Sequence, residues 1–444
     1  MKSRKFGRII LALAVSLGTG MFVTSCTTDY TVGYLWVTSA QYNEISGYRI
    51  DNNYGQLRPS TKSPFPSGGV DPIRVLSADN GRFVYVLNAG CGGTGQAACV
   101  NSSNGQPAAS TSPNISLFTV GGTGSLTYQQ SYTGQGSYPI DMMTDSTGAY
   151  LFVLDTYAPD PTTCTAYVST NPASKCGDIT LFLIDPNTGR LSLVTNQISK
   201  NSAGTNLTYF PIGSAPIHFA LSTGGYLYTI EKGSGSALDP FQAAFVYFFN
   251  STTGQLTLTQ NTPIPTNATN LTFIYAAPQY VYLLDAGNET TAGTILPYTA
   301  GTNGALQSVA GGAVPNTGTT ANPSSMIVDH TNKFVYIANS GPNLTPTSPS
   351  SSVSAFFITP TTGLLQPLSS GAAANSVVFG SGSAPQCILE DPSNQYLYTA
   401  NYVDSTITGA IMNQAAGTLT NLRKASSFSN AGNPTWCTTS GTTF

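Results

Sequence analysis

The chain has 444 residues and a formal net charge of −3, with 8% charged residues, 40% hydrophobic residues and 45 glycines. Its 19 Asp and Glu against 16 Lys and Arg argue against a nucleic-acid partner. With so few charged residues, Ser, Thr, Asn and Gln must cover the surface, which is typical of exported β-proteins. The hydrophobic fraction is large enough for a packed core.

The N-terminus predicts an export signal that ends in a lipid attachment site. Four basic residues precede an apolar run from Ile9 to about Val23, which is the layout of a secretory leader and too short to span a bilayer. The run ends in Val23-Thr24-Ser25-Cys26, which resembles the bacterial lipobox. Cys26 is therefore expected to carry lipid and to become the mature N-terminus; the alternative is an ordinary buried cysteine.

This interpretation predicts an exported protein that is held in the bacterial cell envelope by its lipid alone. Because Thr27 and not Asp follows Cys26, sorting to the outer membrane is expected in a cell that has two membranes. Without the four basic residues of the leader, the mature chain has 12 basic and 19 acidic residues, a formal charge of −7.

A repeat begins at residue 72 and recurs through the rest of the chain. Each copy has a first apolar strand, a polar turn, a strand of the form aromatic-Val-Tyr-x-x-Asn, Asp or Glu, a third strand and a Gly-x-Leu fourth strand. Such short runs, separated by Gly, Asn and Asp, predict four-stranded antiparallel units, and helical periodicity is absent. The copies begin at Pro72, Pro139, Pro216, near Leu271, Pro323 and Pro385.

The N-terminal part begins in the middle of a repeat, and the missing piece lies at the C-terminus. Segments 32–40, 45–51 and 55–60 supply a second, third and fourth strand, whereas Pro434-Thr-Trp-Cys437 copies the start of a repeat. Pairing the last strand with the first three closes a ring without open edges. The sequence therefore predicts an all-β fold, a seven-bladed β-propeller over residues 32–444, which a tether of residues 26–31 joins to a signal peptide of residues 1–25.

Six cysteines remain besides Cys26, an even number in a compartment where disulfides persist. The first two expected pairs each enclose one short polar stretch. Cys387 and Cys437 are the two that remain, and in a closed propeller they follow the opening prolines of neighbouring blades. Free thiols or metal-bound thiolates are the alternatives, although no Cys-x-x-Cys spacing indicates zinc. The expected disulfides are Cys91–Cys99, Cys164–Cys176 and Cys387–Cys437.

The repeated pattern, as in FVYVLNAG at 83–90 and FVYIANSG at 334–341, resembles the seven-bladed propeller lactonases. That family includes bacterial 6-phosphogluconolactonase and the fungal carboxy-muconate lactonising enzyme. The resemblance implies a site of a His, a Glu and arginines at the mouth of the central channel. Glu231, which ends the strand YLYTIE, matches the position of a family acid. The family's His-rich opening of the third blade is replaced by Pro139-Ile140-Asp141, and its Asn-Arg-Gly by Asn339-Ser340-Gly341.

Position within the repeat indicates a second set of candidate residues. The residues two places after the opening prolines are expected near the channel mouth, on the same face as the long loops 89–113, 157–177, 232–243 and 340–351. A cation, an acid and an imidazole there could orient a small polar ligand or activate a water. The alternative is an Arg74–Asp141 ion pair between blades and a satisfied hydrogen bond at His218. The set is Arg74, Asp141, His218, Ser325, Cys387 and Trp436.

The residues that end the second strands form a third set. Most are expected to bond to backbone in the adjacent turn, and their carboxylates and amides could instead hold calcium, the one cofactor considered. His330, in the turn VDHTNKF, is expected to be solvated on the opposite face. The set is Asn88, Asp155, Glu231, Asp285, Asn339 and Asn401.

Two functions are consistent with these features. The first is a hydrolase of a small or sugar lactone, in which Glu231 or His218 activates water and Arg74 stabilises the developing oxyanion, with Asp141 beside them. Phosphorylated sugar lactones are cytoplasmic metabolites, so they do not suit an exported chain. The second is a non-catalytic surface module that binds a glycan, a peptide or a partner protein. A monomer is expected in either case.

Overall fold

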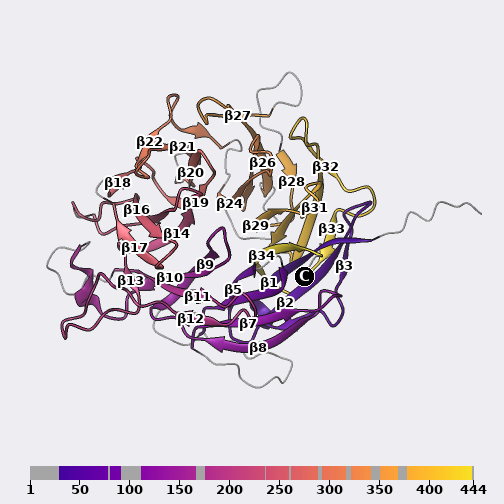
Figure 1. The fold of residues 1–444 in the computed structure, drawn as a ribbon. Coiled ribbons are helices and arrows are strands. Elements are labelled where there is room, and N and C mark those ends of the chain that lie inside the picture. The colour runs from indigo at the N-terminus through magenta and orange to yellow at the C-terminus, as the bar shows by residue number, and fades with distance from the viewer. Residues whose placement is uncertain are drawn as a thin grey trace, which may run out of the picture.

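The computed structural model describes residues 30–78, 81–91, 112–166, 176–235, 237–259, 262–288, 293–316, 322–341, 351–368 and 378–442. In this part of the chain, seven antiparallel sheets stand as blades around a central axis (Figure 1). The predicted all-β, seven-bladed propeller is therefore confirmed. The signal peptide and Cys26 lie outside the described residues. Two short 3-10 helices, η1 (Ala40–Tyr42) and η3 (Pro161–Ala166), occur in the described ranges.

Each blade has four main strands, which follow one another from the axis to the rim, and six blades add a short strand that pairs with the third. The first blade contains β34 (Pro434–Gly441), β1 (Thr31–Ser39), β2 (Glu44–Asp51) and β3 (Leu57–Pro59), with β4 (Phe65–Pro66). The second contains β5 (Pro72–Ala78), β6 (Phe83–Asn88), β7 (Asn114–Val120) and β8 (Leu126–Tyr132). The third contains β9 (Ser137–Thr144), β10 (Tyr150–Tyr157), β11 (Asp178–Ile184) and β12 (Leu191–Leu193), with β13 (Phe210–Pro211).

The remaining four blades repeat this plan. The fourth contains β14 (Pro216–Leu221), β15 (Tyr226–Glu231), β16 (Ala243–Asn250) and β17 (Gln255–Leu258), with β18 (Ile264–Pro265). The fifth contains β19 (Leu271–Ala276), β20 (Tyr280–Asp285), β21 (Thr294–Ala300) and β22 (Leu306–Ser308), with β23 (Val314–Pro315). The sixth contains β24 (Pro323–Val328), β25 (Phe334–Asn339), β26 (Ser352–Ile358) and β27 (Leu365–Pro367), with β28 (Val378–Gly380). The seventh contains β29 (Pro385–Glu390), β30 (Tyr396–Asn401), β31 (Thr406–Met412) and β32 (Leu419–Asn421), with β33 (Ser427–Ser429).

The C-terminal strand closes the ring, as the sequence predicts. β34 pairs antiparallel with β1, in a register that runs from Gly33 opposite Gly441 to Thr38 opposite Trp436. The first blade is thus built from both ends of the described chain.

Disulfides follow the predicted pairing where the structure describes both partners. Bonds join Cys164 to Cys176 and Cys387 to Cys437. The second of these links β29 to β34, the innermost strands of neighbouring blades, and therefore adds a covalent bond across the ring closure. Cys91 is also disulfide-bonded; its predicted partner at position 99 lies outside the described residues.

Strand direction gives the propeller two different faces. Each innermost strand begins beside the end of the second strand, as Pro72 lies opposite Asn88, and finishes beside the start of the second strand, as Ala78 lies opposite Phe83. We call the end at which the innermost strands begin the loop face, because the blade connections and the loops after the second strands lie there. The other end carries the short turns between strands, and we call it the turn face.

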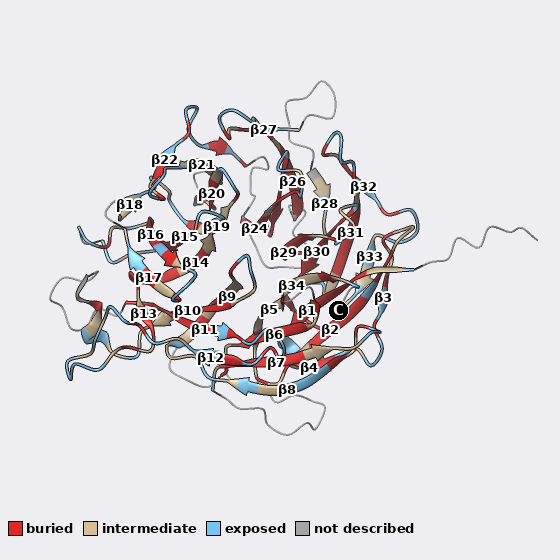
Figure 2. Cartoon of the chain, viewed as in Figure 1, coloured by how far each residue is buried: buried red, intermediate tan, exposed pale blue. Residues whose placement is uncertain are grey.

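The hydrophobic core is divided into seven layers that lie between neighbouring blades. Each layer combines residues of two adjacent sheets; Phe152 and Phe219, for example, join the third and fourth blades. Figure 2 shows buried residues along the inner strands and exposed residues mainly at the outer strands and turns. Every blade face is therefore a contact surface, and no blade can bury its apolar side chains alone.

A glycine in the turn before each fourth strand accounts for the Gly-x-Leu part of the repeat. All seven have φ between 62° and 76°, a conformation that favours glycine. A methyl group on any of them would approach the first aromatic ring of the second strand in the preceding blade to between 2.2 and 2.8 Å. The pairs are Tyr34 with Gly124, Phe83 with Gly189, Tyr150 with Gly254, Tyr226 with Gly304, Tyr280 with Gly363, Phe334 with Gly417, and Tyr396 with Gly55.

Hydrogen bonds reinforce this contact in four blades. A buried tyrosine two residues further along the second strand donates its hydroxyl to the carbonyl of the same glycine. The four bonds, from Tyr85 to Gly189, Tyr282 to Gly363, Tyr336 to Gly417 and Tyr398 to Gly55, measure 2.6 to 3.0 Å. We call the ring and the glycine together the glycine latch; it occurs once at each junction between blades.

We predict that Gly363→Ala destabilises the fold by about 1 to 3 kcal/mol, because the new methyl group is forced against Tyr280 at 2.2 Å. Gly122→Ala is the matched control, since that glycine also lies in a turn before a fourth strand but no atom comes within 4 Å of an added Cβ. Urea unfolding of both variants measures the difference. Equal midpoints for the two would contradict the role of the latch.

Candidate functional site

Three of the predicted site residues meet where the central channel opens on the loop face. Arg74, Asp141 and His218 lie on the innermost strands of the second, third and fourth blades, each two residues after the opening proline. In each strand the pairing register slips by one residue between that proline and the site residue. Such bulges re-aim side chains, and the same slip recurs in these three neighbouring blades.

Asp141 bridges the other two side chains. Its Oδ1 accepts a hydrogen bond of 2.7 Å from Nε of Arg74, and its Oδ2 lies 3.0 Å from Nε2 of His218. The backbone N–H of Met142 donates to the same Oδ1 at 2.9 Å. The predicted Arg74–Asp141 ion pair between blades is therefore present, and His218 extends it to a third blade.

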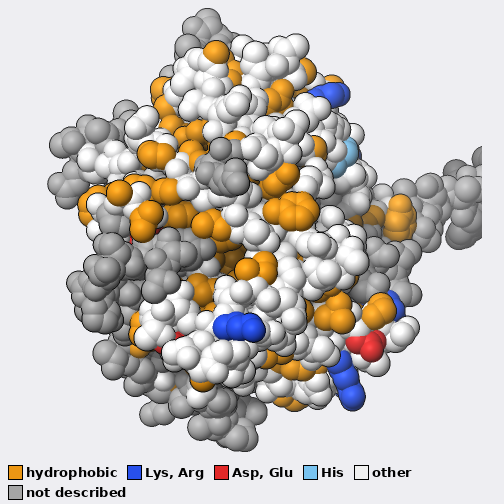
Figure 3. Space-filling view, turned by 60° about the vertical axis from the view of Figure 1, so that its left-hand side comes forward, with side chains coloured by type: hydrophobic (Ala, Val, Ile, Leu, Met, Phe, Trp, Pro, Cys, Tyr) orange, Lys and Arg blue, Asp and Glu red, His pale blue; other side chains and the backbone are white. Residues whose placement is uncertain are grey.

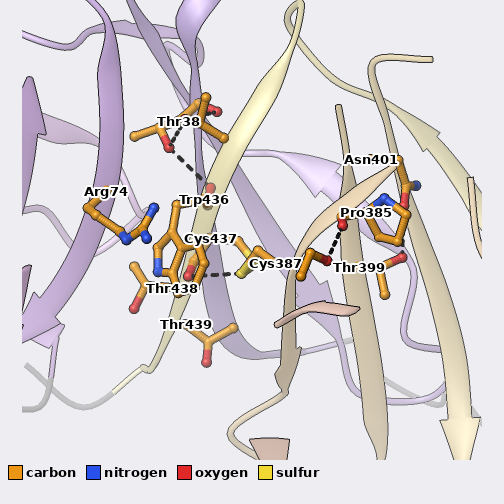
Figure 4. The surroundings of a disulfide bond; sticks show 12 residues. Thr38, Arg74, Pro385, Cys387, Thr399, Asn401, Trp436, Cys437, Thr438 and Thr439 are labelled. Atoms are coloured by element: carbon orange, nitrogen blue, oxygen red, sulfur yellow. Dashed lines mark hydrogen bonds between the residues drawn. A yellow bond between two sulfur atoms is a disulfide. The ribbon is translucent and has the colours of Figure 1, made fainter. Parts of the chain in front are cut away.

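Aromatic rings complete the group across the channel. The guanidinium carbon of Arg74 lies 4.1 Å from the ring centroid of Trp436, within range of a cation–π interaction. Trp436 stacks at 6.3 Å on Phe273, and Phe273 lies 3.9 Å from the imidazole of His218. Figure 4 shows Arg74 alongside the Trp436 ring, next to the disulfide of the ring closure. We call Arg74, Asp141, His218, Phe273 and Trp436 the channel cluster.

Burial sets the electrostatics of the channel cluster. Burial lowers the pKa of His218 to about 4, and the charge of Arg74 contributes to the lowering. The charge of Asp141 acts in the opposite direction and offsets part of it. The imidazole is therefore neutral at pH 7, with its Nε2 beside the Asp141 carboxylate. Side-chain exposure is 17% for Arg74, 10% for His218 and 4% for Asp141. Arg74 is thus the charged member that solvent reaches best.

Glu231, the fourth predicted residue, lies apart from the channel cluster. In the described chain it makes no hydrogen bond or ion pair with Arg74, Asp141 or His218. Its Oε1 accepts a hydrogen bond of 2.8 Å from Thr229, and its other oxygen lies against Gly213. Burial raises the pKa of Glu231 well above its usual range, and the neighbouring Asp239 adds to this. A catalytic role for Glu231 stays a prediction.

The sequence predicts that the other residues that end the second strands bond to backbone in the adjacent turn. Most of them bond instead to side chains of the third strand. Asn88 donates to Asn114 and Ser116 of β7, and Asn401 donates to Thr406 and Thr408 of β31. Asp285 follows the prediction, since it accepts hydrogen bonds from three backbone N–H groups. Because these residues can satisfy one another within a blade, the amides hold the ends of two strands together.

The third blade replaces this amide pair with two acids. Asp155 and Asp178 face each other in register at the ends of β10 and β11 and are at most 1% exposed. The Thr180 hydroxyl lies within reach of both carboxylates, at 3.4 and 3.5 Å. Burial raises the pKa of Asp155 to about 7; burial and the Asp155 charge raise that of Asp178 well above its usual range. The two acids therefore hold a proton where the second blade has amides.

Three observations complete the picture of the described residues. No group of three His, Cys, Asp or Glu side chains among them could hold a metal, and no helix there is long and apolar enough to cross a membrane. His330 lies on the turn face as predicted, but its Nδ1 pairs with Glu390 at 2.6 Å, so it is not simply solvated. Segments 92–111, 167–175 and 342–350 of the long loops lie outside the described part.

Sequence reasoning missed Phe273 and Asp178. Phe273 is two residues after the start of the fourth repeat copy, but that copy opens with Leu271 in place of proline, so the proline that marks the equivalent position in the other copies is absent. Asp178 begins a third strand, whereas the candidates were sought at the ends of second strands. Register counting across the repeat would have found both.

Known proteins resemble this chain in part of its sequence and in its fold. Residues 312–435 match the family model "Lactonase, 7-bladed beta-propeller". This match confirms the resemblance to the propeller lactonases that the repeat predicts. No curated protein matches the chain.

Solved structures share the whole architecture. The periplasmic gluconolactonase of Pseudomonas aeruginosa is 14% identical with a TM-score of 0.63, and the alignment covers 93% of this chain and 100% of that one. A candidate 6-phosphogluconolactonase from Bacteroides fragilis is 16% identical with a TM-score of 0.63, covering 93% and 99%. A protein from Lactobacillus plantarum is 13% identical with a TM-score of 0.62, covering 92% and 99%. At these identities the likeness establishes a lactonase-like seven-bladed propeller and no more.

We predict that the acid pair makes the protein less stable as the pH rises from about 4 to 7. The pKa of Asp155 is about 7 in the folded protein and 3.8 ordinarily, so between these pH values the folded state binds more protons than the unfolded state. The free energy of unfolding therefore falls as the pH rises through this range. His218, whose folded pKa is lowered, contributes with the opposite sign between about 4 and 6.5.

Asp155→Asn isolates the acid pair, because the variant keeps His218 and copies the amide of Asn88 in the second blade. The melting temperature at pH 5 and at pH 8 is the measurement. The melting temperature of the wild type should fall by more between pH 5 and pH 8 than that of the variant. Parallel pH profiles for wild type and variant would contradict the raised pKa of Asp155 in the folded protein.

Proposed function

We propose that the protein is a cell-envelope lactonase that opens a small or sugar lactone at the channel cluster. The observation that carries this proposal is the convergence of Arg74, Asp141 and His218 from three blades on one end of the channel. The matched family model and the gluconolactonase-like fold support the same reaction class. A lactone without phosphate suits the single arginine of the channel cluster.

The reaction needs one base and one site for the oxyanion. Neutral His218 takes a proton from a water that attacks the lactone carbonyl carbon, while Asp141 holds the ring and stabilises the imidazolium that forms. Arg74 donates to the developing oxyanion. The ring C–O bond then breaks, the proton returns from His218 to the departing alkoxide, and a hydroxy acid leaves. Trp436 and Phe273 fill the space beside these groups, so the substrate must displace part of this aromatic pair.

The envelope location rests on the leader and on the lipobox-like Val23-Thr24-Ser25-Cys26. In this proposal Cys26 carries the lipid that holds the propeller at the membrane, in the outer membrane of a cell that has two. The disulfides Cys164–Cys176 and Cys387–Cys437 support an oxidising compartment. Intact mass of the mature protein tests the lipid, since an unmodified Cys26 would contradict it.

A non-catalytic binding module is the second candidate, and one observation favours it. Arg74 pairs with Asp141, and His218 lies 3.0 Å from the same carboxylate. The carboxylic groups whose pKa burial raises most lie outside the channel cluster; they are Asp155, Asp178 and Glu231. In that case the channel cluster is structural, and a glycan, peptide or partner protein binds the loop face.

We predict that the purified mature protein hydrolyses at least one lactone in a panel without phosphate, detected by the acid released. His218→Asn should lower kcat by about 100-fold or more, because it removes the base. Arg74→Lys should lower it less, since a positive charge remains without the planar two-pronged donor. His330→Asn on the turn face is the control and should leave the rate unchanged.

The same panel separates the alternatives. Glu231→Gln decides whether the sequence-predicted acid is the base: loss of turnover there, with turnover retained in His218→Asn, would move the chemistry to Glu231. A wild type that hydrolyses none of the lactones would contradict the lactonase and leave the binding module.

A further inference from the structure

The chain enters the propeller at the turn face, and we propose that the lipid at Cys26 therefore holds the turn face against the bilayer and the loop face away from it. The partner surface is the headgroup layer of a lipid membrane. This inference rests on the lipid anchor of the proposed function, but it does not depend on the reaction.

The first support is the position of the start of β1. Gly33 pairs with Gly441, the last residue of the innermost strand β34, at the turn-face end of the blade. A Cβ on Gly33 would lie 2.7 Å from the side chain of Pro392, which follows β29 in a turn of the seventh blade. Both neighbours belong to the turn face.

The second support is that Tyr30 is fixed there. Its carbonyl accepts a hydrogen bond of 3.1 Å from the backbone N–H of Asn52, and its own N–H donates to Oδ1 of Asn52 at 3.2 Å. Asn52 lies in the turn between β2 and β3, also on the turn face. Two hydrogen bonds thus fix the point at which the chain reaches the propeller.

The reach of the chain then limits the orientation. Four Cα–Cα steps join Cys26 to Tyr30, which span at most about 15 Å. The innermost strands have 6 to 8 residues, so the two faces lie about 20 to 25 Å apart. A tether fixed at Tyr30 is therefore too short for the loop face to contact the bilayer that holds the lipid.

The surface near Tyr30 fits a headgroup layer. The Tyr30 side chain is 62% exposed, and tyrosine is favoured where one end of a side chain meets lipid and the other meets water. The channel mouth on this face is a hollow of about 520 Å³ lined mainly by Ser, Thr and Gly. Figure 3 shows few charged side chains among many uncharged ones on the face in view. The turns of this face also carry both basic residues, such as Arg82 and Lys333, and acidic residues, such as Asp329 and Asp391, so the face has no single charge sign that would exclude zwitterionic or anionic headgroups.

The consequence concerns access to the channel cluster. Arg74, Asp141 and His218 lie at the loop-face end of the innermost strands, so the anchored protein presents them to the aqueous compartment. A water-soluble ligand then reaches the channel cluster without crossing the membrane surface.

The test compares two labelled positions in the same blade. Thr252→Cys lies in the turn between β16 and β17, on the turn face, and Ala237→Cys lies in the loop between β15 and β16, on the loop face; both residues are exposed. Each full-length lipidated variant is labelled with a fluorophore and placed in vesicles that contain headgroup nitroxide lipid. Quenching should remove most of the signal at position 252 and none at position 237. Equal quenching, or stronger quenching at 237, would overturn the orientation.

Two controls keep the orientation separate from the anchor. Inserting about 20 Gly and Ser residues after Thr28 gives a tether with a span of about 25 Å, which should keep vesicle binding but make the quenching at the two positions alike. Mass spectrometry reports the lipid at Cys26 in the same sample. A chain without lipid that stays off vesicles overturns the anchor and the orientation together, whereas a lipidated chain with equal quenching overturns the orientation alone.

Discussion

The glycine latch between neighbouring blades is the constraint on which this structure depends. A blade has two apolar faces and cannot bury either without a neighbour, so the fold needs a contact that sets the distance between sheets. A glycine with positive φ, pressed against the first aromatic ring of the preceding blade, supplies that contact at all seven junctions. The latch from Tyr396 to Gly55 joins the last blade to the first, where the C-terminal strand β34 also completes the sheet.

The backbone of the ring repeats from blade to blade, and the blades differ in chemistry at a few equivalent side-chain positions. Two residues after each blade opening, the same register slip recurs, yet the side chains differ, and only neighbouring choices such as Arg74, Asp141 and His218 make a charged group. The ends of the second and third strands vary in the same manner: Asn88 and Asn114 share an amide hydrogen bond, whereas burial raises the pKa of both Asp155 and Asp178 and favours their protonated forms. Burial decides the result in both places, because it keeps His218 neutral and prevents two adjacent carboxylates from both ionising.

The fold could be predicted from the sequence because its signals are local and repeated. Pro434-Thr-Trp-Cys437 copies the start of a repeat, which predicted the closure and the Cys387–Cys437 bond. The meeting of Arg74 with Asp141 followed from the same counting. The isolation of Glu231 could not be predicted, since it depends on which way a side chain turns at the end of a strand and on Thr229 and Gly213 around it. The Asp155–Asp178 pair was missed because it depends on register between strands separated by a long loop.

The ring buries a neutral His218 against Asp141 at the loop-face end of the channel. The chain has only two histidines, so an NMR titration of the imidazole resonances, assigned with His218→Asn, measures this directly. We expect His218 to titrate near pH 4, because burial outweighs the attraction of Asp141. A His218 that titrates at or above its ordinary pKa of 6.5 would mean a solvated or charged imidazole and would contradict the buried channel cluster.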